Sequence, residues 1–281
     1  IQKNEPFSCI RLGNTENYIL NSLYSGVNVE NHWYNALFNV AGVFPLDAEF
    51  YRTKFLQKNI ESIKNSDIVG WVAITQVNPL EKFESEILKN KVCFTDLEFL
   101  DPAYLVDYDS PWTSFLRDKK VLIVSPHYQS ILRQWNNKKN IWGDNVDKIL
   151  PFELVDVIKS PHPPHIEGGE LEVDGKKLNT WIDSEQYLEN EIKKYDFDLL
   201  IVGAGAYGPS LCSYAKSIDK MAIHPGGATQ LFFGIYGKRW TNSSGCISQQ
   251  KCFNKHWIYP LKEDEPQNKF LVEQIEGNCY W

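Results

Sequence analysis

Two glycine-rich turns hold the residues whose types and spacing are best suited to chemistry: residues 203–208 (GAGAYG) and residues 224–230 (HPGGATQ). Each turn follows a short apolar run of strand length and precedes a helix-like segment. Amides at the start of a helix attract anions, so two adjacent turns of this kind favour a pyrophosphate. The alternative, of equal weight, is that the glycines only let a helix pack closely on a strand. The candidate ligand-binding residues of the two turns are Gly203, Gly205, Tyr207, His224, Gly226, Gly227 and Gln230.

The first turn also matches the GxGxxG pattern of dinucleotide-binding proteins. That pattern expects an acidic residue about 20 positions later, at the end of the next strand, to bind a ribose hydroxyl. Here the next strand-like run, residues 220–224, ends in His224, and no acid stands there. An NAD(P)- or FAD-dependent oxidoreductase is therefore kept only as an alternative. His224 itself could donate to a phosphate or simply cap the turn.

A third turn, residues 11–16 (RLGNTE), ends an alternating strand-like run over residues 7–12. Arg11 can pair with a phosphate through two parallel hydrogen bonds, and Gly13 belongs to the same candidate site. Asn14 and Glu16 place two oxygen-bearing side chains on one turn, which suits Mg²⁺ or Mn²⁺. The alternative is that Asn14 caps a helix and Glu16 interacts with its N-terminal dipole. Glu16 is a candidate base or a candidate metal ligand, but it cannot be both at once.

The clearest strand-like run, residues 119–126, places Ser125 at its end and His127 just beyond it. Because ligands in open α/β sheets lie beyond the carboxyl ends of the strands, both side chains are expected in the cleft. Histidine suits general base or phosphate-binding work, although a solvated loop histidine is an equal alternative. Asp47, in the FPLDAE turn, is a further candidate base.

Two basic residues, Lys238 and Arg239, follow Gly237 at an expected helix end. Cations at that position offset the helix dipole, and the functional alternative is a clamp on a donor phosphate. The chain contains no HExxH, GxSxG or Walker lysine motif, so it offers no sign of a zinc protease, a serine hydrolase or a P-loop NTPase.

The composition excludes several classes of function. The chain has 281 residues, 43% of them hydrophobic, and a net charge of −7 without a block of lysine or arginine, so a nucleic-acid partner is not expected. No apolar run reaches the roughly 18–20 residues that cross a bilayer, and we expect no transmembrane segment. The six cysteines are scattered without a CxxC pair, which argues against structural zinc and favours a cytoplasmic location.

Strand-like and helix-like segments alternate along the chain. This order predicts an α/β fold with a doubly wound, mostly parallel, Rossmann-like sheet and helices on both faces. We expect two closely packed lobes, an N-terminal α/β lobe over residues 1–114 and a nucleotide-binding lobe over residues 115–240, and then a C-terminal surface extension over residues 241–281. Further expected elements are helices at 31–44, 49–64 and 128–135, a helix with Asp183 as N-cap, strands at 68–74, 152–158 and 199–202, and a hairpin near 172–176.

Several of these segments together resemble the GT-D type of nucleotide-sugar glycosyltransferases, and especially related proteins encoded beside surface-polysaccharide genes. The similarity runs from about Phe7 to Trp240, and its most specific part is residues 203–240. The segment FSCIRLGNTE is similar to that group's arginine-glycine-acid turn. Shorter similar segments lie at residues 39–45, 66–72 and 111–135.

The resemblance implies a glycosyltransferase that moves a sugar from a nucleotide-sugar donor, foremost a UDP-sugar, to a glycan acceptor in surface polysaccharide or glycoprotein glycan synthesis. In that family an Asp-x-Glu motif binds the donor, usually with a divalent cation. Here the motif reads Asn14-Thr15-Glu16. An amide lacks the anionic charge, so dependence on Mn²⁺ or Mg²⁺ stays open and Arg11 is expected to bind more of the pyrophosphate charge. A family does not fix a substrate, and a non-catalytic nucleotide- or glycan-binding protein stays an alternative.

Overall fold

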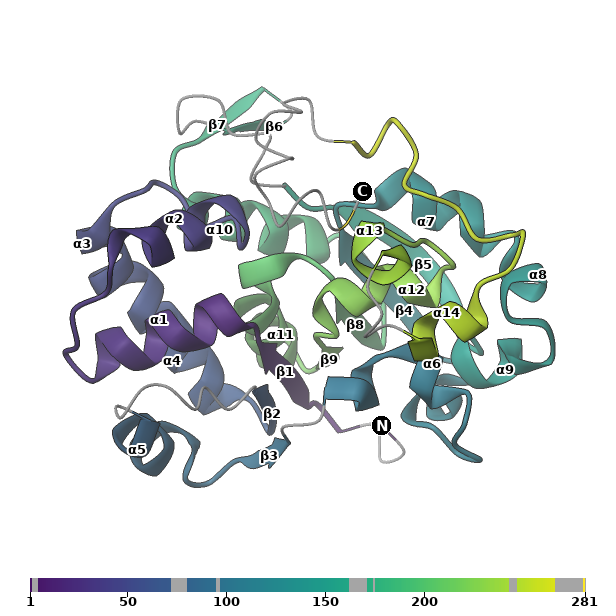
Figure 1. The fold of residues 1–281 in the computed structure, drawn as a ribbon, viewed down its shortest axis with the longest axis horizontal. Coiled ribbons are helices and arrows are strands. Elements are labelled where there is room, and N and C mark those ends of the chain that lie inside the picture. The colour runs from purple at the N-terminus through teal and green to yellow at the C-terminus, as the bar shows by residue number, and fades with distance from the viewer. Residues whose placement is uncertain are drawn as a thin grey trace.

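Seven parallel strands form one sheet in the order β3-β2-β1-β9-β8-β4-β5 (Figure 1). The computed structural model describes residues 1, 5–71, 80–94, 97–161, 171–173, 175–242, 247–265 and 280. The strands are β1 (Ser8–Leu12), β2 (Ile68–Trp71), β3 (Val92–Phe94), β4 (Lys120–Ser125), β5 (Glu153–Lys159), β8 (Leu199–Val202) and β9 (Met221–Ile223). The predicted doubly wound parallel sheet is confirmed.

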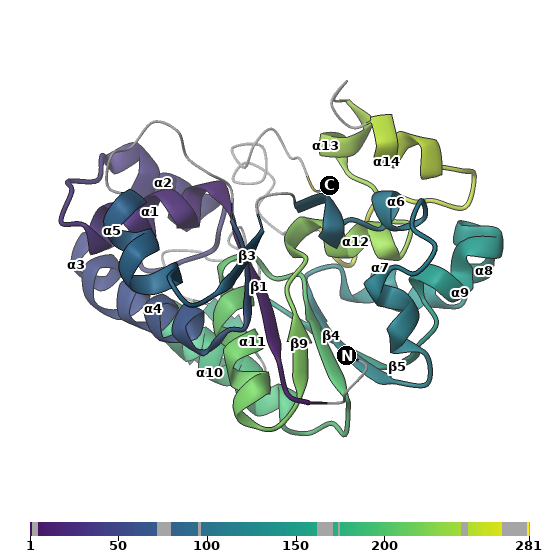
Figure 2. The ribbon, with the colours of Figure 1, turned by 90° about the horizontal axis from the view of Figure 1, so that it is seen from below.

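Helices cover both faces of the sheet (Figure 2). The first face holds α1 (Asn14–Tyr24), α2 (Asn31–Asn39), α4 (Leu56–Asn65), α10 (Trp181–Ile192) and α11 (Gly208–Ser217). The second face holds α6 (Pro102–Leu105), α7 (Tyr128–Trp135), α8 (Lys138–Trp142), α9 (Val146–Ile149) and α12 (Thr229–Phe232). The central strands are therefore buried on both sides, and this is why they read as continuous apolar runs.

Smaller elements connect these layers. The helices are α3 (Ala48–Phe50), α5 (Leu80–Phe83), α13 (Lys238–Thr241) and α14 (Ile247–Cys252), with π-helical turns at Tyr51–Phe55 and Glu84–Leu88. Short 3₁₀ turns lie at Leu97–Leu100, Trp112–Leu116, Gly143–Asn145, Gly205–Tyr207 and Gly226–Ala228. The predicted hairpin is present as β6 (Leu171–Val173) and β7 (Lys176–Leu178), which pair antiparallel.

Helix α10 begins earlier than predicted. Thr180, and not Asp183, is its N-cap: the Thr180 hydroxyl accepts from the amide of Asp183 at 3.1 Å. The Asp183 carboxylate in turn accepts from the amide of Thr180 at 2.9 Å. This reciprocal capping box satisfies two amides that have no partner within the helix. The sequence pattern predicted Asp183 as the N-cap, but Asp183 is the third residue of the helix, so the predicted N-cap lies three positions too late.

Strands from both halves of the chain build the same sheet. β1 pairs with β2 on one side and with β9 on the other. The three strands from the N-terminal part of the chain and the four later strands of this sheet therefore form one continuous sheet. The boundaries at residues 114 and 240 stay predictions. Beyond residue 240, Asp264 is 1% exposed and lies at the start of α7. None of the helices in the described ranges is long and apolar enough to cross a membrane.

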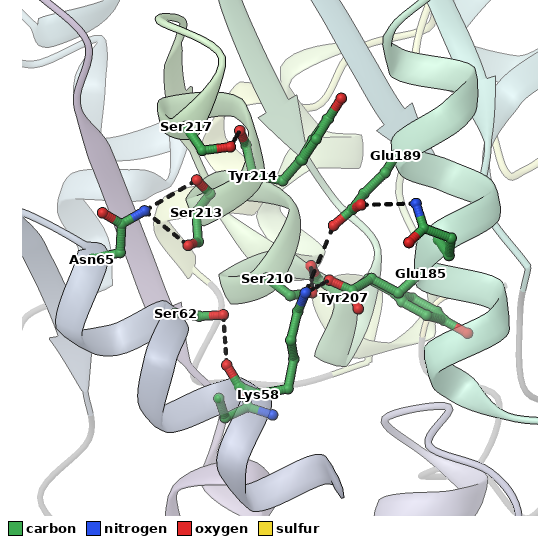
Figure 3. Close-up of polar contacts among 12 residues, drawn as sticks. Lys58, Ser62, Asn65, Glu185, Glu189, Tyr207, Ser210, Ser213, Tyr214 and Ser217 are labelled. Atoms are coloured by element: carbon green, nitrogen blue, oxygen red, sulfur yellow. Dashed lines mark hydrogen bonds and ion pairs between the residues drawn. The ribbon is translucent and has the colours of Figure 1, made fainter.

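A partly buried ion cluster joins α4 and α10 (Figure 3). Lys58 Nζ lies 2.8 Å from Glu185 Oε1 and 3.7 Å from Glu189 Oε1. Glu185 is also hydrogen-bonded to Ser210, which stands in the first turn of α11. Burial raises the pKa of the Glu185 carboxyl to about 7, although Lys58 acts in the opposite direction. The cluster thus fixes the helix that begins at the first glycine turn.

Candidate functional site

Neighbouring strands of the sheet lead to opposite faces. β1 leads to α1 and β8 to α11 on the first face, whereas β9 leads to α12 and β4 to α7 on the second. Such a change of direction opens a crevice beyond the carboxyl ends, where ligands of open α/β sheets bind. A pocket of about 160 Å³ lies there. It is smaller than the roughly 300–1,000 Å³ of typical small-molecule sites, and its size suits a small anionic group.

Most residues predicted for the site line this pocket. They are Arg11, Gly13, Asn14, Glu16, Ser125, His127, Gly203, Gly205, Tyr207, His224, Gly226, Gly227, Gln230 and Arg239. Asp47 and Lys238 are not among the lining residues. The Asp47 carboxylate accepts from the amide of Phe50 at 2.6 Å and caps α3. This placement gives Asp47 a structural role and not the role of a base in the pocket.

The expected position of Lys238 and Arg239 at a helix end is wrong. The helix after the second glycine turn ends at Phe232, and Gly237 is the N-cap of a new short helix, α13. Both cations therefore stand in the first turn of that helix. Lys238 is exposed to solvent, and Arg239 is the one that lines the pocket.

Arg11 brings a guanidinium group to the floor of the pocket. Its Nη1 donates to the carbonyl oxygen of Pro225 at 3.1 Å. Its Nε is buried and has no hydrogen-bond partner among the described residues. Gly226 makes room for this arrangement, because its φ is +65° and a Cβ there would lie 2.5 Å from Arg11 Nη1. The second glycine turn and the arginine thus form one unit.

Tyr280 brings a distant part of the chain onto the same turn. Arg239 Nη1 donates to the Tyr280 hydroxyl at 2.6 Å, and the guanidinium also lies over the ring, 5.1 Å from its centroid. A Cβ on Gly227 would lie 2.5 Å from the Tyr280 ring. The phenol therefore covers the turn and orients the second arginine of the pocket.

The first glycine turn is largely filled by the protein itself. A Cβ on Gly203 would lie 2.6 Å from the Cβ of Thr229. The amide of Ala206 donates to the carbonyl oxygen of Ala41 at 3.2 Å, and Gly205, with φ +53°, passes close to that same carbonyl. The ring of Tyr207 stacks on Trp181 in the core, and burial raises the pKa of this phenol. Fewer amides of this turn are available to an anion than the motif suggested.

His224 is locked in one tautomer. Its Nδ1 lies 2.7 Å from the carbonyl oxygen of Val202, and a carbonyl can only accept, so Nδ1 carries the hydrogen. Burial lowers the pKa of the imidazole to about 4, and the nearby charge of Arg11 acts in the same direction. At neutral pH the remaining nitrogen, Nε2, is therefore an acceptor. This arrangement favours the structural role of His224 over donation to a phosphate.

His127 is also held neutral at physiological pH. It is 4% exposed, and burial lowers the pKa of its imidazole to about 4, against the opposing effects of Asp264 and of a hydrogen bond with Gln230. Asp264 itself accepts from the amides of Gln129 and Ser130 at 2.9 and 2.7 Å. An imidazole with so low a pKa is a weak base, so His127 is better suited to bind a ligand than to remove a proton.

Glu16 is the one carboxylate among the described residues that line the pocket. It stands in the first turn of α1, and its side chain lies back against Gly13, the N-cap of that helix. Asn14 is exposed at the first helical position. The part of the chain that the structure describes holds no group of three or more His, Cys, Asp or Glu residues suited to a metal ion. Among the described residues that line the pocket, Glu16 is therefore the one side chain that could give a divalent cation an anionic ligand.

The residues of the pocket that were not predicted include Ser160, Thr229 and Tyr280. Thr229 lies within the HPGGATQ segment, so its position beside the glycines was a signal that could have been used. Ser160 follows the last residue of β5, and the rule that ligands lie beyond strand ends also applied to it. Tyr280 had no local signal, because its place depends on how the chain returns to the pocket.

Comparisons of the chain with family models, curated proteins and solved structures found no match. The resemblance to GT-D glycosyltransferases is therefore still a prediction. The pocket and the sequence pattern are the basis on which a function can be inferred.

Proposed function

We propose that this protein is a glycosyltransferase that binds the diphosphate of a nucleotide-sugar donor, foremost a UDP-sugar, in the pocket at the carboxyl ends of the strands. The main support is a pair of buried donors without partners among the described residues: Arg11 Nε and Thr229 Oγ1. A buried donor left unpaired costs about 1–3 kcal/mol. The oxygens of a diphosphate would accept from both, and Arg11 and Arg239 would balance the charge.

The proposed reaction needs little more from the protein than placement and charge. The oxygen of an acceptor hydroxyl forms a bond to the anomeric carbon of the sugar. The bond from that carbon to the phosphate oxygen breaks, and its electron pair leaves with the nucleoside diphosphate. The two guanidinium groups stabilise the charge that develops on that leaving group. The hydroxyl proton passes to a carboxylate, for which Glu16 is the candidate in the pocket.

A nucleotide-sugar panel tests this proposal. We expect one donor class, with UDP-sugars first, to raise the melting temperature and to release nucleoside diphosphate slowly in the absence of an acceptor. Ligand at 100 times its dissociation constant adds about 2.7 kcal/mol of stability, which is easily measured. Each donor is tested with and without Mn²⁺, and NAD(H) is included. Release of diphosphate should fall at least ~100-fold in Glu16→Gln, while Glu49→Gln, an exposed acid on α3, serves as the matched control.

The other outcomes separate the alternatives. Stabilisation by NAD(H) alone would contradict the proposal and point to an oxidoreductase. Binding of a nucleotide sugar without turnover, across all donors and in the presence of glycan acceptors, would indicate a non-catalytic nucleotide-binding protein. Full turnover in Glu16→Gln would remove Glu16 as the base and leave donor binding standing.

A further inference from the structure

A second hollow, which we call the acidic groove, adjoins the pocket. It measures about 660 Å³ and runs along Asp156–Lys159 of β5, the last strand of the sheet, and on past residues 160–161. Ser160 and Pro161 line both the groove and the pocket. His127 lines the pocket, and the next residue in the chain, Tyr128, lines the groove. A molecule in the groove would therefore lie against one in the pocket.

The walls of the groove are fixed by hydrogen bonds. The Tyr195 hydroxyl donates to Asp156 Oδ2 at 2.8 Å, which links the turn after α10 to β5. Another part of the lining, residues 262–265, is anchored through Asp264, which accepts from the amide of Ser130 at 2.7 Å and from its hydroxyl at 2.6 Å. The amide of Leu261 donates to that same hydroxyl at 2.8 Å. The groove is thus preformed and needs no ligand to hold its shape.

The lining combines aromatic rings with carboxylates. Among the described residues, the lining includes three tyrosines, five acidic residues and two lysines. The acidic residues are Asp156, Glu172, Glu191, Glu263 and Glu265. Carboxylate oxygens accept hydrogen bonds from hydroxyl and ammonium groups, and an aromatic ring packs against an apolar face that carries a polar rim. An acidic surface also repels phosphates and carboxylates. These properties select a neutral or amino-bearing polyhydroxyl ligand.

Ser160 supplies an independent sign of a ligand at the junction. Its residue is 1% exposed, and its hydroxyl has no hydrogen-bond partner among the described residues. Buried polar groups are nearly always paired, and one that is not calls for an explanation such as a bound ligand. A ligand hydroxyl reaching the shared wall between groove and pocket would supply that partner.

We propose that the acidic groove binds the acceptor, a neutral or amino-bearing saccharide, with one of its hydroxyls at Ser160 beside the pocket. This inference rests on the proposed transferase function, because it assigns the groove to the second substrate of that reaction. The acceptor would be bound by Tyr187, Tyr195 and the carboxylates, and its reactive end would enter the pocket past Ser160.

Three trisaccharides of equal length test the proposal on the full chain: chitotriose, its fully deacetylated form, and trigalacturonate. We expect binding of the first two in ligand-observed NMR and calorimetry, with the cationic sugar the tighter, and no binding of the anionic one. Ser160→Ala should weaken chitotriose binding about three- to tenfold and leave the melting temperature of the free protein unchanged or higher, because it removes an unpaired hydroxyl. Ser8→Ala is the matched control: Ser8 is likewise fully buried with an unpartnered hydroxyl, but it lies at the start of β1.

Several results would overturn the assignment. Equal binding of all three sugars, or unchanged chitotriose affinity in Ser160→Ala, would contradict it. Binding of a basic peptide such as hexalysine with no saccharide bound would assign the groove to a protein partner. Donor binding is measured in the same samples. Saccharide binding without any donor binding would support the groove and contradict the transferase, and donor binding without saccharide binding would do the reverse.

Discussion

The two glycine turns follow neighbouring strands, β8 and β9, yet their surroundings use them differently. At the first turn, the missing side chains make room for other parts of the core: Gly203 accommodates Thr229, and Gly208 accommodates the ring of His224. At the second turn, Gly226 accommodates the guanidinium of Arg11, and Gly227 accommodates the ring of Tyr280. The first turn thus packs against uncharged residues of the second turn's own segment, and the second turn contacts the charged side chain of Arg11 and the aromatic ring of Tyr280.

This difference shows that a motif does not by itself identify the binding turn. GxGxxG is the better-known pattern, but one of its amides donates to the carbonyl oxygen of Ala41 and is not available to a phosphate. The Gly226-Gly227 pair matches no named pattern, and it adjoins Arg11 and Tyr280, whose hydroxyl accepts a hydrogen bond from Arg239. We therefore expect changes at the first turn to act on stability and changes at the second turn to act on ligand affinity.

The largest effect is expected from Gly208→Ala. The backbone of Gly208 is already helical, with φ −52°, so alanine would normally stabilise this position by about 1 kcal/mol. Here the added Cβ would collide with the imidazole of His224, which is buried and bound to Val202. Three ring atoms would lie 2.3 Å from that Cβ, so the cost should exceed the usual range of about 1–3 kcal/mol for overpacking, and we expect the free energy of unfolding to show a net fall of about 3 kcal/mol in urea denaturation.

A second substitution checks that the collision is the cause. The double variant Gly208→Ala/His224→Ala removes the ring, so it should be more stable than the sum of the two single changes predicts. Additive losses would mean that Gly208 acts through something other than His224. An unchanged unfolding midpoint in the single variant would refute the packing role of the first turn.

The second effect concerns Arg11 and should appear mainly in affinity. Arg11→Gln removes the cation whose Nε is unpartnered among the described residues. A hydrogen bond to a charged group contributes about 1.5–3 kcal/mol, so calorimetric affinity for pyrophosphate and for UDP should fall about 30-fold. The melting temperature of the unliganded protein should fall less than in Gly208→Ala, because the change removes one internal hydrogen bond, from Arg11 Nη1 to the Pro225 carbonyl oxygen. Arg117→Gln, an exposed arginine outside the pocket, is the control. If both variants lost the same affinity, the effect of Arg11→Gln would come from the change in net charge and not from a contact in the pocket.

The sequence was most informative where a local pattern decides the structure. Residues 199–202 are apolar without interruption because β8 is buried on both faces, and the strand has those bounds. Helix α7 likewise spans the predicted residues 128–135, because the strand before it ends in Ser-Pro. Of the predicted strand at 68–74, the first four residues form β2, and the rest lie outside the described residues.

The sequence was least informative where contacts join distant segments. The amide of Ala206 donates a hydrogen bond to the carbonyl oxygen of Ala41, although 165 positions separate the two residues. No local sequence pattern predicts this hydrogen bond. Tyr280 reaches the second glycine turn for reasons of tertiary packing alone. Asp47 showed the converse problem, because a carboxylate in a polar turn looks the same in sequence whether it caps a helix or acts as a base. Most residues that line the pocket could be named from the sequence, but which of the two turns contacts Arg11 and Tyr280 could not.

The smallest effect should come from the ion cluster that supports the first turn. Glu185 is 2% exposed, and burial raises the pKa of its carboxyl to about 7 in the folded state, against about 4.5 when unfolded. Below pH 4.5 both states are protonated, and the stabilising contribution is fully present. As the pH rises through 7 the folded protein must ionise a buried carboxyl, so this contribution is lost.

Glu185→Gln should therefore flatten the pH dependence of stability. In the wild type we expect the free energy of unfolding to fall between pH 5 and pH 8, and the glutamine variant should lose on the order of 1 kcal/mol of that change. Glu49→Gln, an exposed acid on α3, should keep the wild-type slope. Pyrophosphate affinity should be the same in all three proteins at each pH, because the cluster supports the turn that packs and not the turn that binds. If Glu185→Gln also lowered the affinity for pyrophosphate, the two glycine turns would act as one functional unit, and the distinction between them would be wrong.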